Sequence, residues 1–297
     1  MNSLLKKEYD TISAQIKKID DLKNKKVLIT GASGLIGSYL VNYLVYLNKN
    51  FNSNIKIFTI SRNREILLKK FNQEDIIIIE QDLNEPLKFS ETFDYVIHAA
   101  SNAHPLAYSQ NPVETMKTNI IGTINLLEMI KNTPCKFIYI SSGEVYGNNV
   151  DENPFNESDF GIIDTKEFRS CYPESKRAAE TLCVSYNKQF NVPINVLRFC
   201  YIYGPTINNE NTRADAQFLR NVVNGENIIL KSEGNQKRTY CYVADAVSAI
   251  LYAILNGENC EFYNVANPDS IVTIKEYAQI LASIAGVELK FELPSKT

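Results

Sequence analysis

Residues 26–37 read KVLITGASGLIG, a short β-rich run followed at once by a glycine-rich loop. A helical pattern begins near Leu35, so the loop joins a strand to a helix at the start of a βαβ series. Glycine permits a tight turn and lets a pyrophosphate approach the backbone at the helix N-terminus. The stretch therefore predicts a dinucleotide-binding loop. Its expected cofactor contacts are Gly31, Ser33, Gly34, Leu35, Ile36 and Gly37.

The same alternation of strands and helices continues along the chain. Strand-like runs occupy 26–30, 55–60, 75–80, 94–99, 136–141, 194–199 and 261–266. Helical patterns occupy 35–48, 113–132, 173–190, 214–224, 244–256 and 273–285. Nearly continuous apolar strands that alternate with amphipathic helices indicate a parallel sheet covered on both faces. The prediction is an α/β fold, a doubly wound parallel Rossmann sheet with a smaller C-terminal substrate-binding lobe.

The pattern also predicts how the chain is divided. Residues 1–24 carry apolar positions at helical spacing among lysines and acids, which indicates an N-terminal helical extension that packs on the body or on a partner subunit. Residues 25–190 form the expected dinucleotide-binding domain, completed by the strands near 194–199 and 261–266. Residues 200–297 belong mainly to the substrate lobe. Two loop-rich regions, 147–171 and 203–240, are expected over the carboxyl edge of the sheet.

Composition limits the classes of partner. The formal net charge of −3 over 297 residues argues against a surface built for nucleic acid. The six cysteines form no CxxC pair, so neither a metal cluster nor a redox couple is expected, and they read as reduced thiols of a cytoplasmic protein. The most apolar helical run is about 13 residues, whereas a membrane span needs about 20. We therefore expect no nucleic acid, membrane or metal partner.

The end of the second strand bears on the choice of cofactor. An acidic residue there usually holds the ribose 2′-hydroxyl of NAD, but this strand ends in Ser61, Arg62 and Asn63. An arginine accepts a 2′-phosphate instead, or it stacks on adenine or faces solvent. Both NAD and NADP stay open at this point. Asp82 and Leu83, after the third strand, lie where an adenine ring would reach.

A possible redox site follows the fifth strand. Tyr172 and Lys176 form a YxxxK pair, and residues four apart on a helix share one face. A neighbouring ammonium favours the phenolate, which predicts a usable base near neutral pH. Ser142, at the end of the strand, is positioned to orient the same substrate oxygen. Neither His98, in a buried-looking strand, nor His104, on a loop, is given a catalytic role.

These features together resemble the extended branch of the short-chain dehydrogenase/reductase superfamily, the NAD-dependent epimerases and dehydratases that modify nucleotide sugars. The motifs that carry the resemblance span nearly all of the chain from Lys25. They are VIHAAS at 96–101, NIIGTINLLE at 119–128, SSGEVYG at 141–147, YPESKRAAE at 172–180, LRFCYIYGP at 197–205 and RTYCYVADAV at 238–247.

The resemblance implies roles for individual residues. Tyr172 would be the catalytic base, Lys176 would bind the nicotinamide ribose and tune Tyr172, and Ser142 would hydrogen-bond the sugar hydroxyl being oxidised. Arg238 would contact the substrate diphosphate, a natural task for a guanidinium or, alternatively, a surface ion-pair residue. The residues implied to line or support the cofactor are Ala99, Ala100, Ser101 and Asn119.

Subfamilies of these enzymes differ in the step that comes after oxidation of the sugar at C4. A second proton transfer needs an acid/base carboxylate, and Glu144 occupies a matching place two residues after Ser142. In dTDP-glucose 4,6-dehydratases an Asp precedes that Glu; here its place is taken by Gly143, which disfavours that subtype. GDP-mannose 4,6-dehydratases and UDP-glucuronate decarboxylases lack the Asp and stay compatible. The asparagine usual before YGP is replaced by Tyr201 in the expected substrate pocket.

The expected function is C4 oxidation of a nucleotide sugar with bound NAD(P), followed by dehydration, decarboxylation or epimerisation, with catalysis by Ser142, Glu144, Tyr172 and Lys176. One alternative is a C4 dehydrogenase or a keto-sugar reductase, and a remote one is a non-catalytic NAD(P)-binding regulator. The resemblance also implies a homodimer through the helices at 113–132 and 173–190. Many relatives continue beyond the position of Thr297, so either the lobe is short or the sequence is cut.

Overall fold

A computed structural model describes residues 2–88, 91–103, 105–148, 153–205 and 211–293. A seven-stranded sheet with all strands parallel forms its centre, in the order β11-β6-β5-β4-β1-β2-β3. The predicted Rossmann sheet is confirmed, although the third strand is two residues shorter at its start than predicted. The strands are β1 (Lys26–Thr30), β2 (Lys56–Ser61), β3 (Ile77–Glu80), β4 (Tyr95–His98), β5 (Lys136–Ser142), β6 (Ile194–Phe199) and β11 (Glu261–Val265).

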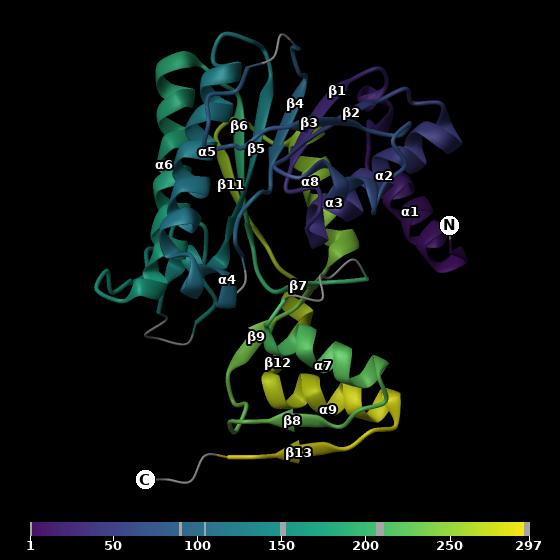
Figure 1. The fold of residues 1–297 in the computed structure, drawn as a ribbon, viewed down its shortest axis with the longest axis vertical. Coiled ribbons are helices and arrows are strands. Elements are labelled where there is room, and N and C mark those ends of the chain that lie inside the picture. The colour runs from purple at the N-terminus through teal and green to yellow at the C-terminus, as the bar shows by residue number, and fades with distance from the viewer. Residues whose placement is uncertain (1, 89–90, 104, 149–152, 206–210, 294–297) are drawn as a thin grey trace.

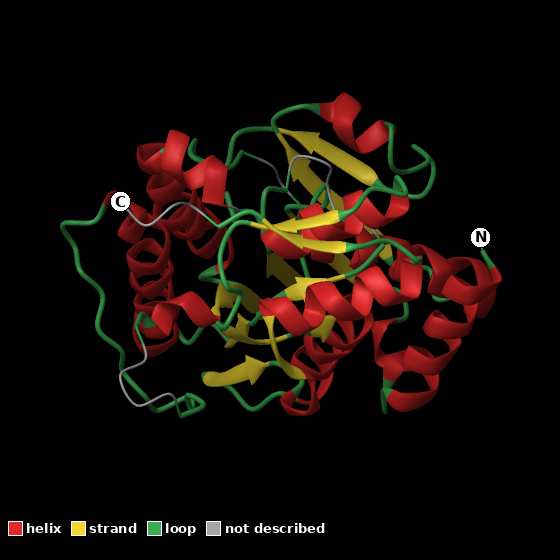
Figure 2. Ribbon diagram, turned by 90° about the horizontal axis from the view of Figure 1, so that it is seen from below, coloured by secondary structure: helices red, strands yellow, loops and turns green. Residues whose placement is uncertain are grey.

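Helices cover both faces of this sheet (Figures 1 and 2). One face carries α2 (Leu35–Phe51) and α8 (Val243–Asn256), whose buried apolar side chains share a core with β1. The other carries α5 (Pro112–Ile130) and α6 (Cys171–Phe190), which pack against each other and bury Leu126, Leu127 and Ala179. Burial from both sides is why the strands read as continuous apolar runs.

The N-terminal helix α1 (Ser3–Gln15) packs on the outside of α2 and α8 (Figure 1). Its Tyr9 ring is almost fully buried and meets the rings of Tyr39 and Tyr43 edge-on. Aromatic pairs with this geometry add to the stabilisation from burial alone. The helix thus lies on the body of the chain, one of the two placements that the sequence left open.

A smaller lobe lies below the carboxyl edge of the sheet in Figure 1. Its two helices, α7 (Ala214–Val223) and α9 (Ile274–Ala285), pack together over a small core that includes Phe218 and Ala278. Three short strand pairs complete it and join it to the sheet. They are β7 (Ile202–Tyr203) with β10 (Cys241–Tyr242), β9 (Lys237–Thr239) with β12 (Ile271–Thr273), and β8 (Ile228–Leu230) with β13 (Leu289–Phe291).

Two short helices were not predicted: α3 (Arg64–Leu68) and α4 (Pro105–Gln110). A five- or six-residue segment is too short to show an amphipathic period, so the sequence carries no signal for it. His104 and parts of the two predicted loop regions lie outside the described residues. No helix within the described ranges has the length and apolar character needed to cross a bilayer. The boundaries of the sequence-derived domains stay a prediction.

Candidate active site

The glycine loop lies between β1 and α2, against the end of β4. Gly31 has φ of +70°, and a Cβ there would lie 2.6 Å from the carbonyl carbon of Ala99. A Cβ on Gly37 would lie 2.3 Å from the oxygen of Gly31. Side chains are therefore excluded at both positions, which keeps the backbone tight and brings the loop beside Ala99 and Ala100. Gly34 caps α2 without a side-chain hydrogen bond, so Leu35 and Ile36 open the helix beside a bare backbone turn.

Two buried polar side-chain atoms of the candidate site lack a hydrogen-bond partner among the described residues. The Ser101 Oγ and the Asn119 Oδ1 are buried and have no hydrogen-bond partner within the described part of the chain. The amide nitrogen of Asn119 donates to the Ser175 Oγ at 2.9 Å, so its orientation is fixed. Buried polar groups normally find a partner, and a polar ligand would satisfy these two. The glycine cradle and these atoms fit a dinucleotide, with the pyrophosphate at the loop and the nicotinamide end near Ser101.

The adenosine end of such a ligand would meet the ends of β2 and β3. Arg62 follows β2 and has an exposed side chain, while Leu83, after β3, is buried. The Leu83 carbonyl accepts a hydrogen bond from Asn125 at 2.7 Å, and the Asp82 carboxylate accepts one from the backbone N–H of Asn84 at 2.9 Å. The structure thus places these three predicted residues at one edge of the sheet, apart from the YxxxK pair.

Ser142, Tyr172 and Lys176 come together at the carboxyl end of β5. All three are at least nine-tenths buried, and the Ser142 hydroxyl hydrogen-bonds the Tyr172 phenol. The Lys176 Nζ donates to the Ile140 carbonyl at 2.7 Å and lies 6.0 Å from the centre of the Tyr172 ring. The hydroxyl, phenol and ammonium therefore occupy the arrangement that the sequence motif predicted.

The electrostatics of this group differ from the sequence expectation. Burial raises the pKa of Tyr172 to about 12, although the charge of Arg213 and the hydrogen bond from Ser142 act to lower it. Burial also lowers the pKa of Lys176 to about 7. The expectation that a neighbouring positive charge makes the phenolate of Tyr172 accessible near neutral pH is therefore wrong for the chain by itself. Desolvation raises the pKa of Tyr172 more than the neighbouring charge lowers it. Tyr172 is a neutral proton donor here until positive charge enters the site.

Glu144 lies beside this group on a 3-10 turn, Gly143–Tyr146. Its backbone N–H donates to the Ser142 Oγ at 3.2 Å, and its side chain is 31% exposed. The carboxylate forms an ion pair with Arg169 at 3.6 Å. A Cβ on Gly143 would lie 2.5 Å from the Cys200 Sγ, so an aspartate does not fit there unless Cys200 moves. Glu144 is therefore the carboxylate next to the redox group.

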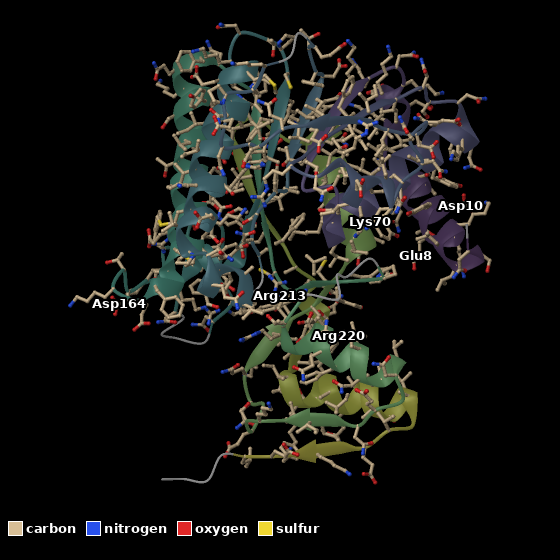
Figure 3. All side chains as sticks on the ribbon, in the orientation of Figure 1. Glu8, Asp10, Lys70, Asp164, Arg213 and Arg220 are labelled. Atoms are coloured by element: carbon tan, nitrogen blue, oxygen red, sulfur yellow. The ribbon has the colours of Figure 1, made fainter. Side chains whose placement is uncertain are left out.

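Two arginines near Tyr172 were missed from the sequence. Arg169 lies over the ring of Tyr108, which in turn stacks on Tyr172 with ring centres 5.4 Å apart. Arg213, labelled in Figure 3, comes from the start of α7 and donates to the Ala103 carbonyl at 2.7 Å. Its charge acts to lower the pKa of Tyr172, Tyr108 and Tyr201. The one local signal for either residue is that Arg169 lies three residues before Tyr172 in the sequence.

The two predicted substrate residues of the lobe are also close together. The Arg238 guanidinium lies 4.8 Å from the centre of the Tyr201 ring, a cation–π contact. Tyr201 has φ of +43°, an unusual conformation for a tyrosine, and its side chain is 36% exposed. Strained residues of this kind concentrate at functional sites. Beside Arg169 lies a cavity of about 420 Å³, lined by Pro105, Leu106, Tyr108, Ser109, Phe168, Arg169 and Thr212.

The sequence and the fold of this chain have counterparts in known proteins. The sequence profile of the NAD dependent epimerase/dehydratase family matches residues 27–266. The chain belongs to this family. The resemblance inferred from the motifs is therefore confirmed.

Individual relatives define the kind of chemistry. UDP-glucuronic acid decarboxylase 6 of Arabidopsis thaliana is 32% identical over 274 residues, which cover 92% of this chain and 78% of that protein. The crystal structure of a Thermotoga maritima UDP-glucose 4-epimerase with UDP-glucose aligns with a TM-score of 0.78 at 25% identity, covering 91% and 86% of the two chains. The chain is an NAD(P)-dependent enzyme that modifies nucleotide sugars.

A UDP-glucuronic acid 4-epimerase from Bacillus cereus shares the fold. Its structure in complex with UDP-glucuronic acid and NAD aligns with a TM-score of 0.74 at 23% identity, covering 90% of this chain and 85% of that one. At this identity the likeness concerns the fold.

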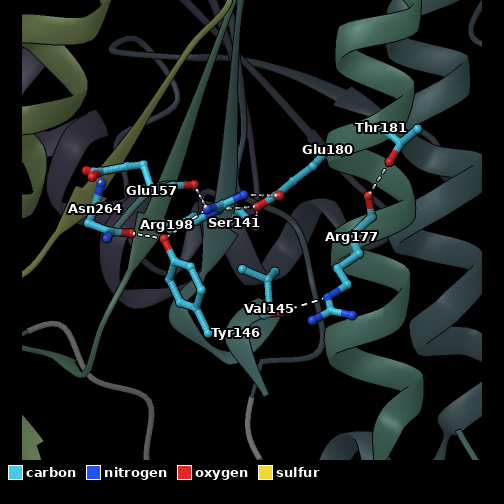
Figure 4. A network of polar contacts seen from close by, with 9 residues as sticks. All are labelled: Ser141, Val145, Tyr146, Glu157, Arg177, Glu180, Thr181, Arg198 and Asn264. Atoms are coloured by element: carbon cyan, nitrogen blue, oxygen red, sulfur yellow. Dashed lines mark hydrogen bonds and ion pairs between the residues drawn. The ribbon is translucent and has the colours of Figure 1, made fainter. Parts of the chain in front are cut away.

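A network of polar contacts fixes the turn that carries Glu144 (Figure 4). The Arg198 guanidinium donates to Glu180 at 2.8 Å and to the Tyr146 hydroxyl at 2.8 Å. From α6, Arg177 donates to the Val145 carbonyl at 2.7 Å. Further contacts link Glu180 to Ser141 and Tyr146 to Asn264. Held from three elements, the turn keeps Glu144 in place without a bound ligand.

Lys176 makes a pH-dependent contribution to stability. Its pKa is about 7 in the folded chain and has an ordinary value of 10.5. Between these values the unfolded chain binds more protons, so stability is lost as the pH falls through the interval and levels off below about 7. A Lys176→Met variant lacks this loss. We expect its advantage in unfolding free energy over the wild type to grow as the pH falls across the interval, measured by urea unfolding; a constant difference would contradict the assignment.

Proposed function

We propose that the enzyme decarboxylates a nucleotide-linked hexuronic acid. The observation that carries the proposal is the pair of guanidinium groups, Arg169 and Arg213, which come from different elements and lie close enough to the Tyr108 ring for both charges to act on its pKa. A neutral hexose gives two arginines no anion to bind next to its ring. A C6 carboxylate is an anion at that place, and guanidinium groups match carboxylates in geometry and charge.

The ion pair between Arg169 and Glu144 supports the same substrate class. At 3.6 Å the pair is loose, and the Arg169 side chain is 62% exposed. Such a pair contributes little to stability, so a bound carboxylate replaces Glu144 as the partner of Arg169 at little cost. Glu144 is then free to act on the sugar ring. The decarboxylases among the relatives point to the same chemistry.

The residues divide the reaction between them. A bound nicotinamide supplies the acceptor, and later the donor, of the C4 hydride. Tyr172 receives the proton of the C4 hydroxyl, while the Ser142 hydroxyl holds that oxygen. The resulting C4 ketone is β to the carboxylate, so the C5–C6 bond breaks, its electron pair forms the C4 enolate, and carbon dioxide leaves. Glu144, after it has taken up a proton from solvent, then delivers that proton to C5, and Tyr172 returns its own proton to the C4 oxygen when the hydride is returned to C4.

The arginines bind and orient in this scheme and do not drive the bond cleavage. An ion pair to the carboxylate stabilises the reactant anion, and neutral carbon dioxide loses that stabilisation. Their contribution is to hold the C5–C6 bond in the orientation from which its electrons enter the carbonyl. The hydrogen bonds from Tyr172 and Ser142 to the C4 oxygen stabilise the charge that develops there. Dehydration of the dTDP-glucose type is disfavoured because Cys200 fills the space beside Gly143.

A panel of nucleotide sugars, followed by mass spectrometry, tests the proposal. Loss of carbon dioxide from a nucleotide hexuronate is expected. Loss of water, loss of two hydrogens, or an epimer of unchanged mass would each contradict it and assign the dehydratase, dehydrogenase or epimerase reaction instead.

Binding of two ligands that differ only at C6 tests the role of Arg213. Arg213→Gln is expected to weaken UDP-glucuronate binding by roughly 10- to 100-fold and to leave UDP-glucose binding unchanged, because one charge-assisted hydrogen bond is lost. The matched control is Arg220→Gln on the same helix, whose guanidinium donates to the Asn211 carbonyl within the lobe (Figure 3). Equal losses for both ligands would contradict the carboxylate assignment.

A further inference from the structure

The end of β2 lacks the acidic residue that usually binds the adenosine ribose of NAD. The strand ends at Ser61, and the next two residues are Arg62 and Asn63, so no carboxylate is available for a ribose 2′-hydroxyl at this position. Arg62 is exposed, and within the described residues it takes part in no hydrogen bond or ion pair. Its guanidinium is thus available to an anion.

A second cation lies on the other side of the same position. Lys70 follows α3, and its Nζ donates to the Ser33 carbonyl of the glycine loop at 2.6 Å. Figure 3 labels this lysine in the region of α3 and α2. Partial burial lowers its pKa, as expected for an ammonium held against the backbone. An ammonium has three donors, so two are left for a ligand after the bond to Ser33.

The sheet topology puts both cations at the adenosine ribose. β1 and β2 are neighbours, with Thr30 paired to Ile60, so the glycine loop after β1 and Arg62 after β2 leave the same edge side by side. In this fold the pyrophosphate lies at the first loop and the ribose 2′ position at the end of the second strand. Lys70, bonded to Ser33, and Arg62 therefore both come from the edge of the sheet where the ribose 2′ position is expected.

Two acidic residues, Glu80 and Glu65, lie near the end of β2. The Glu80 carboxylate, at the end of β3 opposite Ser61, accepts from the backbone N–H of Arg64 at 3.4 Å. The backbone N–H of Glu65, on α3, donates to the Asn63 side chain, and the Glu65 carboxylate is exposed. Arg64 itself donates to the Ile78 carbonyl. Arg62 and Lys70 have no carboxylate partner among the described residues at this edge.

We propose that Arg62 and Lys70 form a binding site for a 2′-phosphomonoester on the adenosine ribose, so that the enzyme selects NADP over NAD. Arg62 offers a planar fork to the phosphate, and Lys70 offers a point charge from the loop side. The solved Bacillus cereus structure with the same fold holds NAD, so this would be a departure from that neighbour. The inference rests on the family's dinucleotide site and is independent of which sugar is bound.

Equilibrium binding of two adenosine fragments tests the proposal without any turnover. Isothermal titration of the intact chain with adenosine 2′,5′-bisphosphate and with 5′-AMP isolates the effect of the 2′-phosphate. We expect the bisphosphate to bind at least tenfold more tightly, and this preference to weaken with added salt. Equal affinities, tighter binding of 5′-AMP, or binding of neither fragment would overturn the proposal.

Variants then assign the preference to the two cations. Arg62→Ala and Lys70→Ala are each expected to weaken bisphosphate binding about tenfold while 5′-AMP binding is kept, which also shows that the variants are folded. Lys69→Ala is the matched control, since Lys69 is the adjacent exposed lysine at the end of the same helix. A bisphosphate preference that survives both Arg62→Ala and Lys70→Ala would remove these residues from the site. If the nucleotide-sugar panel shows no decarboxylation, these binding results still hold, because they involve no sugar substrate.

Discussion

Replacement of Tyr172 by phenylalanine is expected to lower kcat by roughly 10²- to 10⁴-fold, the usual contribution of a positioned general acid or base. The variant keeps the ring that stacks on Tyr108 and loses only the hydroxyl bonded to Ser142. Substrate binding is therefore expected to change little, and the loss appears in kcat measured on a nucleotide hexuronate. The reason is that the lost hydroxyl is the proposed acceptor of the proton from the C4 oxygen.

Tyr186→Phe is the matched control for this prediction. Tyr186 lies on the same helix and loses a hydroxyl that hydrogen-bonds Glu128 on the far side from the site. It is expected to keep kcat within about twofold, as most exposed substitutions do. A Tyr172→Phe enzyme that retained more than about a tenth of wild-type turnover would show that the proton goes elsewhere.

The charge state of the site bears on the proposed role of Tyr172. Burial holds its pKa at about 12, and burial also brings the pKa of Lys176 to about 7. In the chain by itself the phenol is protonated and the lysine is only partly charged near neutral pH. The site is therefore arranged as a hydrogen-bond donor to the C4 oxygen. Its capacity to accept a proton depends on charge brought in by a ligand.

The parts of this site that could be predicted from sequence are those fixed by local spacing. The YxxxK pair needs only one turn of helix, and Ser142 needs only the end of a strand in a parallel sheet. The glycine loop is equally local, since Gly31 and Gly37 contact each other's backbone. The parallel sheet covered on both faces follows from the alternation of strands and helices and the right-handed crossover rule.

The parts that could not be predicted depend on contacts between distant segments. Arg213 reaches Ala103 across 110 positions of sequence, and Lys70 reaches Ser33 across 37. The contact between Gly143 and Cys200 arises from the pairing of β5 with β6. The raised pKa of Tyr172 has the same origin, because its desolvation is produced by elements that no motif names. The residues proposed to carry the chemistry follow from sequence patterns, whereas Arg213 and Lys70, which are proposed to set specificity, required the fold.

Replacement of Glu144 by glutamine is expected to separate the two halves of the reaction. Hydride removal at C4 uses Ser142 and Tyr172, which the substitution leaves intact. In the proposed reaction the proton delivered to C5 comes from the protonated carboxyl group of Glu144, and an amide does not supply it. Overall turnover is therefore expected to fall by roughly 10²- to 10³-fold. A 4-keto sugar and the absorbance of the reduced nicotinamide are expected to accumulate, measured by mass spectrometry and rapid-mixing spectroscopy.

The control for Glu144→Gln is Glu174→Gln, because the two carboxylates have nearly equal exposure and each pairs with an arginine. Glu144 is 31% exposed and lies 3.6 Å from Arg169, while Glu174 is 32% exposed and lies 3.5 Å from Arg177. A general effect of removing a half-exposed charge would appear in both variants. Only a carboxylate that acts on the sugar gives the stalled keto intermediate. Full turnover in Glu144→Gln, or equal losses of turnover in the two variants, would show that Glu144 takes no part in the chemistry. Its role would then be the ion pair with Arg169.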